Sequence, residues 1–162
     1  MNNKEKYKTV LSQLITLYLL VVSFVSHASD KELSLKSLEI LKNDIRGKKS
    51  VVVLWSLECP PCFKELETIS QLTQQNKKLS LILINTDDAS EYSKERQQVL
   101  MKYKLNRLTS FYFQNEKKEQ LKYKIDPNWF GELPRSYFVS ADGLWQGRSG
   151  VIEENHLKRW FL

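Results

Sequence analysis

Two cysteines, Cys59 and Cys62, are the residues whose type and spacing most clearly indicate chemistry, and the sequence contains no others. They follow an apolar, β-branched run over residues 51–55 and precede a helix-like segment. A Cys-x-x-Cys pair in that position is typical of a dithiol/disulfide redox centre. The alternative is a pair of buried thiols without chemistry, and we favour the redox centre.

The expected helix start favours a reactive thiolate at Cys59. The first N–H groups of a helix have no intrahelical partner, and with the positive end of the helix dipole they favour a thiolate over a thiol. Pro60 and Pro61 suit the first turn because their φ is already helical and they lack N–H groups. The N–H groups of Cys62 and Phe63 are therefore the expected donors to the Cys59 sulfur. Cys62, one turn later, is placed to resolve a mixed disulfide.

The segment Trp-Ser-Leu-Glu-Cys-Pro-Pro-Cys-Phe-Lys-Glu-Leu at residues 55–66 resembles the active-site segment of the thioredoxin superfamily. It is most similar to the exported TlpA/ResA-like branch, which serves periplasmic thiol reduction and cytochrome c maturation. Residues 131–143 resemble the cis-proline loop of the same family and the strand and turn that follow it. The resemblance covers residues 33–161. It implies an α/β, thioredoxin-like fold with a central mixed sheet flanked by helices and a TlpA/ResA-type insertion.

The resemblance also implies a substrate-binding segment. It places a cis proline at Pro134, beside the cysteines, where the backbone of Leu133 is exposed as a short edge that pairs with an extended peptide. The alternative is an ordinary trans proline at the start of a strand. Trp129 and Phe130, in the preceding loop, are candidates for lining the same peptide groove, although each is more often a core or loop residue.

Two glutamates near the cysteines are candidates for tuning them. The charge of Glu58 opposes a thiolate at Cys59 and so raises its pKa, which favours a reductant; the alternative is a solvated charge without effect. Glu65 follows Cys62 by three residues, which matches the Cys-x-x-Cys-x-x-Glu pattern of part of the ResA-like branch. Thioredoxin's buried aspartate corresponds to Val53 here. Glu65 is therefore the candidate for proton transfer, unless it is an exposed surface residue.

The elements that position these residues follow from periodicity and turn residues. A helix is expected over residues 31–43, capped by Asp30, and a helix over 89–103 with Tyr92, Val99 and Tyr103 buried. The strand before the cysteines is apolar on both faces, as in a central strand. The remaining expected elements are strands over 51–57, 79–85, 108–113, 136–140 and 144–148, and helices over 60–76, 116–123 and 153–161.

Residues 1–28 are expected to be a targeting segment. Lysines precede an apolar stretch over residues 10–25, and Ser-His-Ala at 26–28 supplies small residues for a signal peptidase. We expect cleavage after Ala28, which leaves a periplasmic or otherwise exported domain over residues 29–162. The alternative is an uncleaved N-terminal membrane anchor. Because disulfides persist after export, the cysteine pair must be cycled by a dedicated partner.

The expected activity is reduction of protein disulfides. Cys59 attacks the substrate disulfide, Cys62 releases the reduced protein, and a membrane-embedded thiol electron donor restores the dithiol. The resemblance suggests apocytochrome c as a substrate. The alternative is a copper(I)-binding carrier or assembly factor on the same fold, but related copper-delivery proteins space their cysteines wider and add a histidine, both of which are missing here.

Other classes fit the sequence less well. Disulfide-forming oxidants usually carry a histidine between their cysteines, and peroxiredoxin-type peroxidases carry Pro-x-x-x-Thr-x-x-Cys; neither pattern is present. The net charge of +6 is moderate and no dense Lys/Arg cluster stands out, so a nucleic acid is not an expected partner. We expect no cofactor and no metal, and the sequence leaves the oligomeric state open.

Overall fold

The structure is a computed structural model that describes residues 30–87 and 91–161. The expected targeting segment lies outside the described residues. Within them, no helix is both long enough and apolar enough to cross a membrane. The elements are β1 (Lys31–Leu33), α2 (Leu35–Asp44), β2 (Ser50–Trp55), α3 (Pro60–Gln75), β3 (Ser80–Asn85), α4 (Ser93–Lys102), β4 (Thr109–Phe113), a 3₁₀ turn (Asn115–Lys117), α5 (Lys118–Ile125), β5 (Arg135–Val139), β6 (Trp145–Ser149) and α6 (Glu154–Phe161).

The described strands form one six-stranded mixed sheet in the order β1-β4-β3-β2-β5-β6. The first four strands of this order are parallel, whereas β5 is antiparallel to β2 and β6 is antiparallel to β5. All six residues of β2 are buried, as expected for a strand with neighbours on both sides and helices on both faces. This arrangement confirms the expected thioredoxin-like fold.

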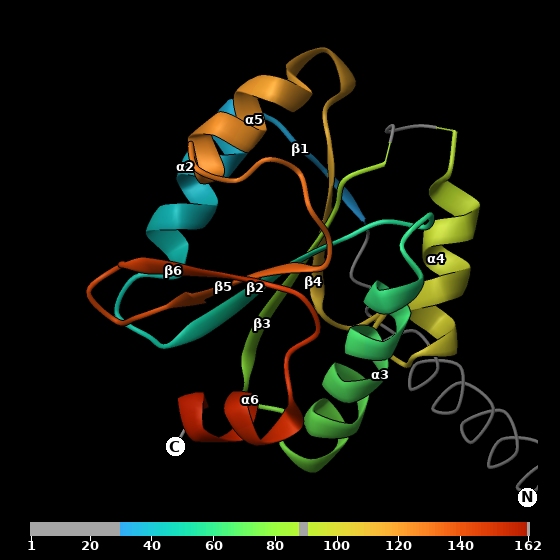
Figure 1. The fold of residues 1–162 in the computed structure, drawn as a ribbon, viewed down its shortest axis with the longest axis vertical. Helices are drawn as coiled ribbons and strands as arrows, with labels where there is room; N and C mark the ends of the chain where they lie inside the picture. The colour runs from blue at the N-terminus through green and yellow to red at the C-terminus, as the bar shows by residue number, and fades with distance from the viewer. Residues whose placement is uncertain (1–29, 88–90, 162) are drawn as a thin grey trace, which may run out of the picture.

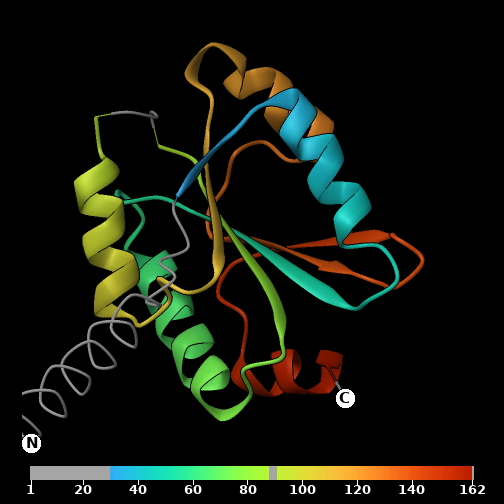
Figure 2. The ribbon, with the colours of Figure 1, turned by 180° about the vertical axis from the view of Figure 1, so that it is seen from behind.

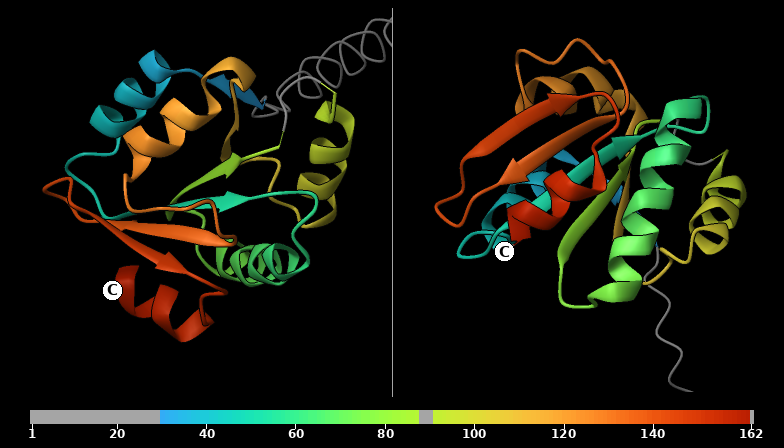
Figure 3. Two further views of the ribbon diagram at one scale, coloured as in Figure 1. Left: turned by 45° about the horizontal axis from the view of Figure 1, so that its top comes forward. Right: turned by 60° about the horizontal axis from the view of Figure 1, so that its bottom comes forward.

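Alternation along β2 divides the core into two layers. Val52 and Leu54 belong to the cluster beneath α2 and α5, whereas Val51, Val53 and Trp55 belong to the cluster beneath α3, α4 and α6. Figures 1 and 2 show α2 and α5 side by side at one end of the molecule and α3 and α6 at the other. The left view in Figure 3 shows the same separation between α2 and α5 on one side and α6 on the other. The cysteine pair opens α3 and therefore lies on the second layer.

Residues 31–33 are a correction to the sequence-based expectation, because they form the edge strand β1 and not the first turn of a helix. Lys31 lies opposite Phe111 of β4, eighty positions along the chain. The helix begins at Leu35 instead, and Ser34 is its cap: Ser34 Oγ accepts from Ser37 N, and Ser37 Oγ accepts from Ser34 N. The helix therefore starts at Leu35 and not at residue 31, because residues 31–33 pair with β4 and the Ser34 capping box sets the first turn.

Asp30, expected to cap that helix, is instead part of a buried ion pair. Its Oδ2 lies 2.6 Å from Nε of Arg96 on α4, and the two side chains are 4% and 1% exposed. Its Oδ1 accepts a 2.9 Å hydrogen bond from Ser110 Oγ on β4. The Arg96 guanidinium also lies over the Tyr112 ring, 4.4 Å from its centroid. This cluster fixes the start of the described chain to α4 and β4.

The prediction of which α4 side chains are buried is also partly wrong. Tyr92 is exposed, and Val99 and Tyr103 are only half-buried against the α3 layer. The helix buries Leu100 and the charged Arg96 in their place. The sequence did not indicate that Arg96 is buried, because its burial depends on pairing with Asp30, which is distant in the sequence.

Arg135, the first residue of β5, ties the loop before it to the sheet. Its guanidinium lies 2.7 Å from Asp126 Oδ2 and 3.4 Å from Glu132 Oε1, and it donates a 2.7 Å hydrogen bond to Ser149 Oγ on β6. Gly147, also on β6, leaves room for it: a Cβ atom there would lie 2.1 Å from Arg135 Nη2. The guanidinium therefore fills the space that a larger residue would occupy.

Candidate active site

The two cysteines form a disulfide at the point where β2 has ended and α3 begins. Cys59 is the N-cap of α3 and is 8% exposed, whereas Cys62 is fully buried. Both belong to the apolar cluster on the α3 side of the sheet. A partner can therefore reach Cys59 more readily than Cys62, which is the asymmetry that a nucleophile and a resolving thiol need.

The expected donors to the Cys59 sulfur are not present in this disulfide form. The Cys59 side chain accepts no capping hydrogen bond. The N–H of Cys62 instead donates to the Cys59 carbonyl at 3.0 Å, as in a tight first turn. The physical reason is that the Cys59 sulfur is turned toward Cys62 by the covalent bond between them. The expectation of amide donors thus applies to the dithiol form alone.

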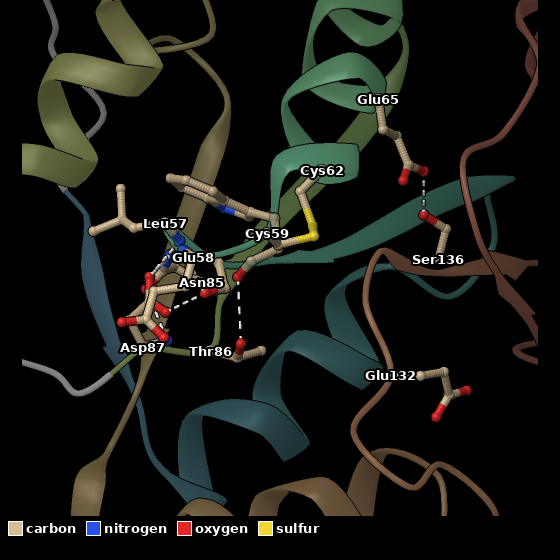
Figure 4. The surroundings of a disulfide bond; sticks show 12 residues. Leu57, Glu58, Cys59, Cys62, Glu65, Asn85, Thr86, Asp87, Glu132 and Ser136 are labelled. Carbon is tan, nitrogen blue, oxygen red and sulfur yellow. Dashed lines mark hydrogen bonds between the residues drawn. A yellow bond between two sulfur atoms is a disulfide. The ribbon is translucent and has the colours of Figure 1, made fainter.

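Asp87, which follows β3, holds the loop that leads into Cys59, as Figure 4 shows. Its carboxylate accepts hydrogen bonds from Ser56 Oγ, from the N–H of Leu57 at 2.7 Å and from Asn85 Nδ2 at 2.9 Å. Sequence reasoning missed this residue. A signal was available, because the carboxyl ends of neighbouring parallel strands meet at one edge of a sheet, and Asp87 follows β3 as Ser56 follows β2.

Glu65 is buried, so the alternative of an exposed surface residue is wrong. Its side chain is fully inaccessible, and its Oε1 accepts a 2.7 Å hydrogen bond from Ser136 Oγ on β5. Figure 4 shows the Glu65 side chain pointing from α3 toward Ser136, on the side of the helix that carries the disulfide. Its Oε2 is buried without a hydrogen-bond partner among the described residues. Burial raises the pKa of Glu65 to about 7, although the Ser136 hydrogen bond lowers it in part.

Glu58, in contrast, lies at the surface beside Cys59. It takes part in the approach loop through its backbone, where its N–H donates to Ser56 Oγ at 3.0 Å. Its side chain lines a shallow pocket of about 170 Å³ together with Leu57, Asp87, Tyr92 and Lys118. The structure thus brings one candidate glutamate into the core near Cys62 and leaves the other in solvent near Cys59.

The Leu133–Pro134 peptide bond is cis, and Pro134 directly precedes β5. Leu133 is half-buried and contacts the apolar clusters on both sides of the sheet. Within the described part of the chain, its backbone N–H and C=O form no hydrogen bond. Since β5 pairs with β2, this segment runs beside the end of β2, from which the loop to Cys59 departs.

Trp129 is a correction among the expected site residues. It is 5% exposed, belongs to the core beneath α2 and α5, and donates its indole N–H to the Glu132 carbonyl at 2.9 Å. Its ring is therefore not available to line a peptide groove. The neighbouring Phe130 is 90% exposed and is the aromatic residue that this loop presents to solvent.

No group of three or more His, Cys, Asp or Glu side chains that could hold a metal ion is found in residues 30–87 and 91–161. Cys59 and Cys62 are bonded to each other and offer no thiolate in this form.

The comparison with protein families finds a match to the AhpC/TSA family over residues 26–144. Among curated proteins, the chain is 24% identical over 165 residues to sporulation thiol-disulfide oxidoreductase A of Bacillus subtilis (strain 168). That match covers 91% of this chain and 96% of the relative.

Solved structures share the fold. A secreted Mycobacterium tuberculosis disulfide oxidoreductase homologous to Escherichia coli DsbE superposes with a TM-score of 0.56 at 20% identity, over 74% of this chain and 84% of that one. StoA from Bacillus subtilis superposes with a TM-score of 0.54 at 19% identity, over 71% and 83% of the two chains. The similarity in fold therefore covers most of the described chain and not only the active-site segment.

Proposed function

The chain belongs to the AhpC/TSA family, and we propose that it is a thiol-disulfide oxidoreductase that reduces disulfide bonds of exported proteins through the Cys59/Cys62 dithiol. The observation that carries this proposal is the disulfide at the start of α3, with Cys59 the more exposed partner and Cys62 fully buried. The named activities of the Bacillus subtilis and Mycobacterium tuberculosis relatives support the same chemistry.

The first step is attack by Cys59. In the dithiol form its thiolate attacks one sulfur of the substrate disulfide, so that a Cys59–substrate bond forms and the substrate S–S bond breaks. The other substrate sulfur leaves as a thiolate and takes a proton from water. The N-terminal end of α3 favours this thiolate, because the positive end of the helix dipole stabilises a negative charge there.

The second step is resolution by Cys62. Its thiol transfers a proton to the Glu65 carboxylate, and the resulting thiolate attacks the Cys59 sulfur. The disulfide seen in the structure forms, the Cys59–substrate bond breaks, and the second substrate sulfur leaves as a thiolate. Glu65 suits the role of proton acceptor because its pKa of about 7 lets it exchange protons near neutral pH. The substrate gains two electrons and the cysteine pair loses them.

The backbone of Leu133 is the proposed contact for the substrate chain. Its N–H and C=O have no partner among the described residues, and an extended peptide that supplies both would add a short strand pairing beside Pro134. Of the two aromatic candidates on the loop before it, Phe130 is exposed and Trp129 is buried, so Phe130 is the proposed aromatic contact. Backbone pairing carries little sequence preference, so this contact suits a set of unfolded or extended proteins that carry a disulfide, apocytochrome c among them.

The oxidised pair has to be reduced again for a new cycle. We propose that a membrane-embedded thiol donor does this on the exported side, where the signal expected over residues 1–28 delivers the domain. The charge of Glu58, next to Cys59 in sequence, opposes a Cys59 thiolate and so acts in the reducing direction, with a small effect because solvent screens it. A measured reduction potential near about −120 mV, at the oxidising end for such proteins, would contradict this direction.

A trapping experiment tests the function. Cys62→Ser prevents resolution, so substrate proteins should accumulate on Cys59 as mixed disulfides that can be isolated and identified from the exported fraction. Cys59→Ser is the matched control, because it leaves one thiol but removes the attacking one, and it should trap nothing. If Cys62→Ser captures no exported protein with paired cysteines, or if the wild-type protein does not accelerate insulin reduction by dithiothreitol, the reductase proposal is wrong.

A further inference from the structure

We propose that Ser136 is a positioning residue for the resolving step: its hydroxyl holds one oxygen of Glu65 and leaves the other oxygen available to the Cys62 thiol. The inference rests on the reductase function proposed above and assigns a role to a residue that does not contact the substrate. It also explains why a strand that is otherwise apolar toward α3 carries a buried hydroxyl.

The geometry starts from two fully buried polar side chains. Ser136 Oγ donates to Glu65 Oε1 at 2.7 Å, and neither residue is accessible to solvent. Glu65 Oε2 is also buried and has no partner among the described residues. Buried carboxylate oxygens normally have partners, so an unpaired one beside a redox site indicates a group that acts in another state of the cycle. Cys62 and Glu65 are three residues apart on α3 and therefore share a helix face.

The hydroxyl is carried by a strand that is paired on both sides. Ser136 lies on β5 between two paired strands, opposite Val53 of β2 and Arg148 of β6. The backbone that carries its Oγ is therefore held on both sides by strand pairing, in contrast to a hydroxyl on a loop. Ser136 is also only two residues after Pro134, so the proposed substrate contact and the Glu65 anchor belong to one short segment. Glu65 is thus fixed relative to both the substrate segment and the resolving thiol.

Few charges surround this pair. Cys62 shares α3 with Glu65, Arg148 of β6 lies opposite Ser136 in the strand register, and His156 of α6 contacts Phe138, two residues along β5; none of them is among the causes that shift the pKa of Glu65. Burial is the main cause that raises the pKa of Glu65, and the Ser136 hydrogen bond is the cause that lowers it. Removing the hydroxyl therefore raises the pKa of Glu65 further, because it removes the group that stabilises the carboxylate.

The size of the change follows from the strength of such bonds. A hydrogen bond to a charged group changes the protonation equilibrium by on the order of one pH unit. A midpoint that moves from about 7 to about 8 lowers the carboxylate fraction at pH 7 about fivefold. If that carboxylate accepts the Cys62 proton, resolution at pH 7 slows about fivefold and recovers at higher pH.

The experiment compares Ser136→Ala with Ser110→Ala in the full chain. Ser110 is the matched control because it too is a buried strand serine that donates to a carboxylate, Asp30, away from the cysteines. The reduced proteins are mixed with an aromatic disulfide that releases one coloured thiolate on attack by Cys59 and a second on resolution by Cys62. The pH dependence of the second release reports resolution, and the first release reports attack.

Ser136→Ala should move the midpoint of the second release up by about one pH unit and leave the first release within about twofold of wild type. Ser110→Ala should lower stability and leave both midpoints unchanged. Ser136→Thr restores the hydroxyl and should return the midpoint toward the wild-type value. Coincident wild-type and Ser136→Ala midpoints, or an equal shift in Ser110→Ala, would overturn the inference.

A separate readout needs no turnover. The carboxyl carbon of Glu65, followed by NMR across pH in the oxidised protein, should titrate about one unit higher in Ser136→Ala than in wild type. If the wild-type protein resolves no mixed disulfide at any pH, the reductase proposal fails, and this titration still tests the Ser136–Glu65 contact. If the titration does not move while resolution proceeds normally, the contact does not position Glu65.

Discussion

Two buried carboxylates of this protein each accept a hydrogen bond from a buried serine, but only one of the two has a cation beside it. Glu65 accepts a hydrogen bond from Ser136 at 2.7 Å, and Asp30 accepts one from Ser110 at 2.9 Å. Asp30 also has Arg96 at 2.6 Å. Glu65 has no cation within salt-bridge distance among the described residues, and one of its oxygens is unpaired.

This difference in partners distinguishes Asp30, which is held in an ion pair, from Glu65, which has no cation beside it. A buried carboxylate beside a guanidinium forms an ion pair, and removing either partner leaves an uncompensated buried charge. A buried carboxylate with only a hydroxyl partner exchanges its proton near neutral pH, as the raised pKa of Glu65 indicates. The same kind of hydrogen bond therefore accompanies an ion pair in one region and the proposed proton acceptor in the other.

The largest expected effect comes from breaking the ion pair. Arg96→Met keeps the apolar part of the side chain and leaves Asp30 buried without its cation, which should cost about 3–5 kcal/mol in the free energy of unfolding. Denaturant titration of the purified protein measures this loss. The double variant Asp30→Asn with Arg96→Met should recover part of it, because no unpaired charge then remains. A loss below about 1 kcal/mol for Arg96→Met would show that Asp30 is reached by water and that the two carboxylates do not differ as described.

The next effect is a pH dependence of stability that only the unpaired acid produces. Its folded-state pKa of about 7 lies above the ordinary 4.5, so folding takes up a proton between these values. Stability from this group is therefore complete below pH 4.5 and falls as pH rises through about 7, by up to about 3 kcal/mol. Glu65→Gln removes the titration, so the difference between wild-type and variant free energies isolates it. A difference that is constant from pH 5 to 8 would mean that Glu65 is not a buried, protonatable acid.

The smallest effect is expected from Glu58, which tests whether burial or mere closeness to a cysteine matters. It is adjacent to Cys59 in sequence but lies in solvent, where its charge is screened. Glu58→Gln should change the rate of Cys59 alkylation in the reduced protein at pH 7 by less than about twofold. A change of tenfold or more would make the exposed glutamate, and not the buried one, the main electrostatic control of the pair.

Local patterns were enough to predict the centre of the fold. The β-branched run before Cys59, the prolines after it and the apolar spacing beyond them predicted β2 and α3 to within two residues, because strand, cap and helix signals are all contiguous there. The expected strands over 79–85 and 108–113 likewise match β3 and β4 closely. Buried parallel strands have a strong signal, since each is apolar on both faces.

Contacts between distant segments were the part that could not be predicted. The strand β1 exists through pairing with β4, and the burial of Arg96 depends on Asp30, sixty-six positions away. Glu65 stayed ambiguous because its position on α3 fits either face until Ser136, seventy-one positions later, is placed opposite it. Trp129 and Phe130 are adjacent aromatics, and only the loop conformation decides which of them enters the core.

Gly147 on the edge strand β6 is an exception to a common rule of protein engineering. Exchanging a strand glycine for alanine usually gains stability by restricting the unfolded chain. At Gly147 the added methyl group would lie 2.1 Å from Arg135 Nη2, so the guanidinium would have to shift away from its partners Asp126 and Ser149. A thermostabilisation campaign that made this exchange on general grounds would weaken contacts of the strand that follows Pro134, next to the proposed substrate contact.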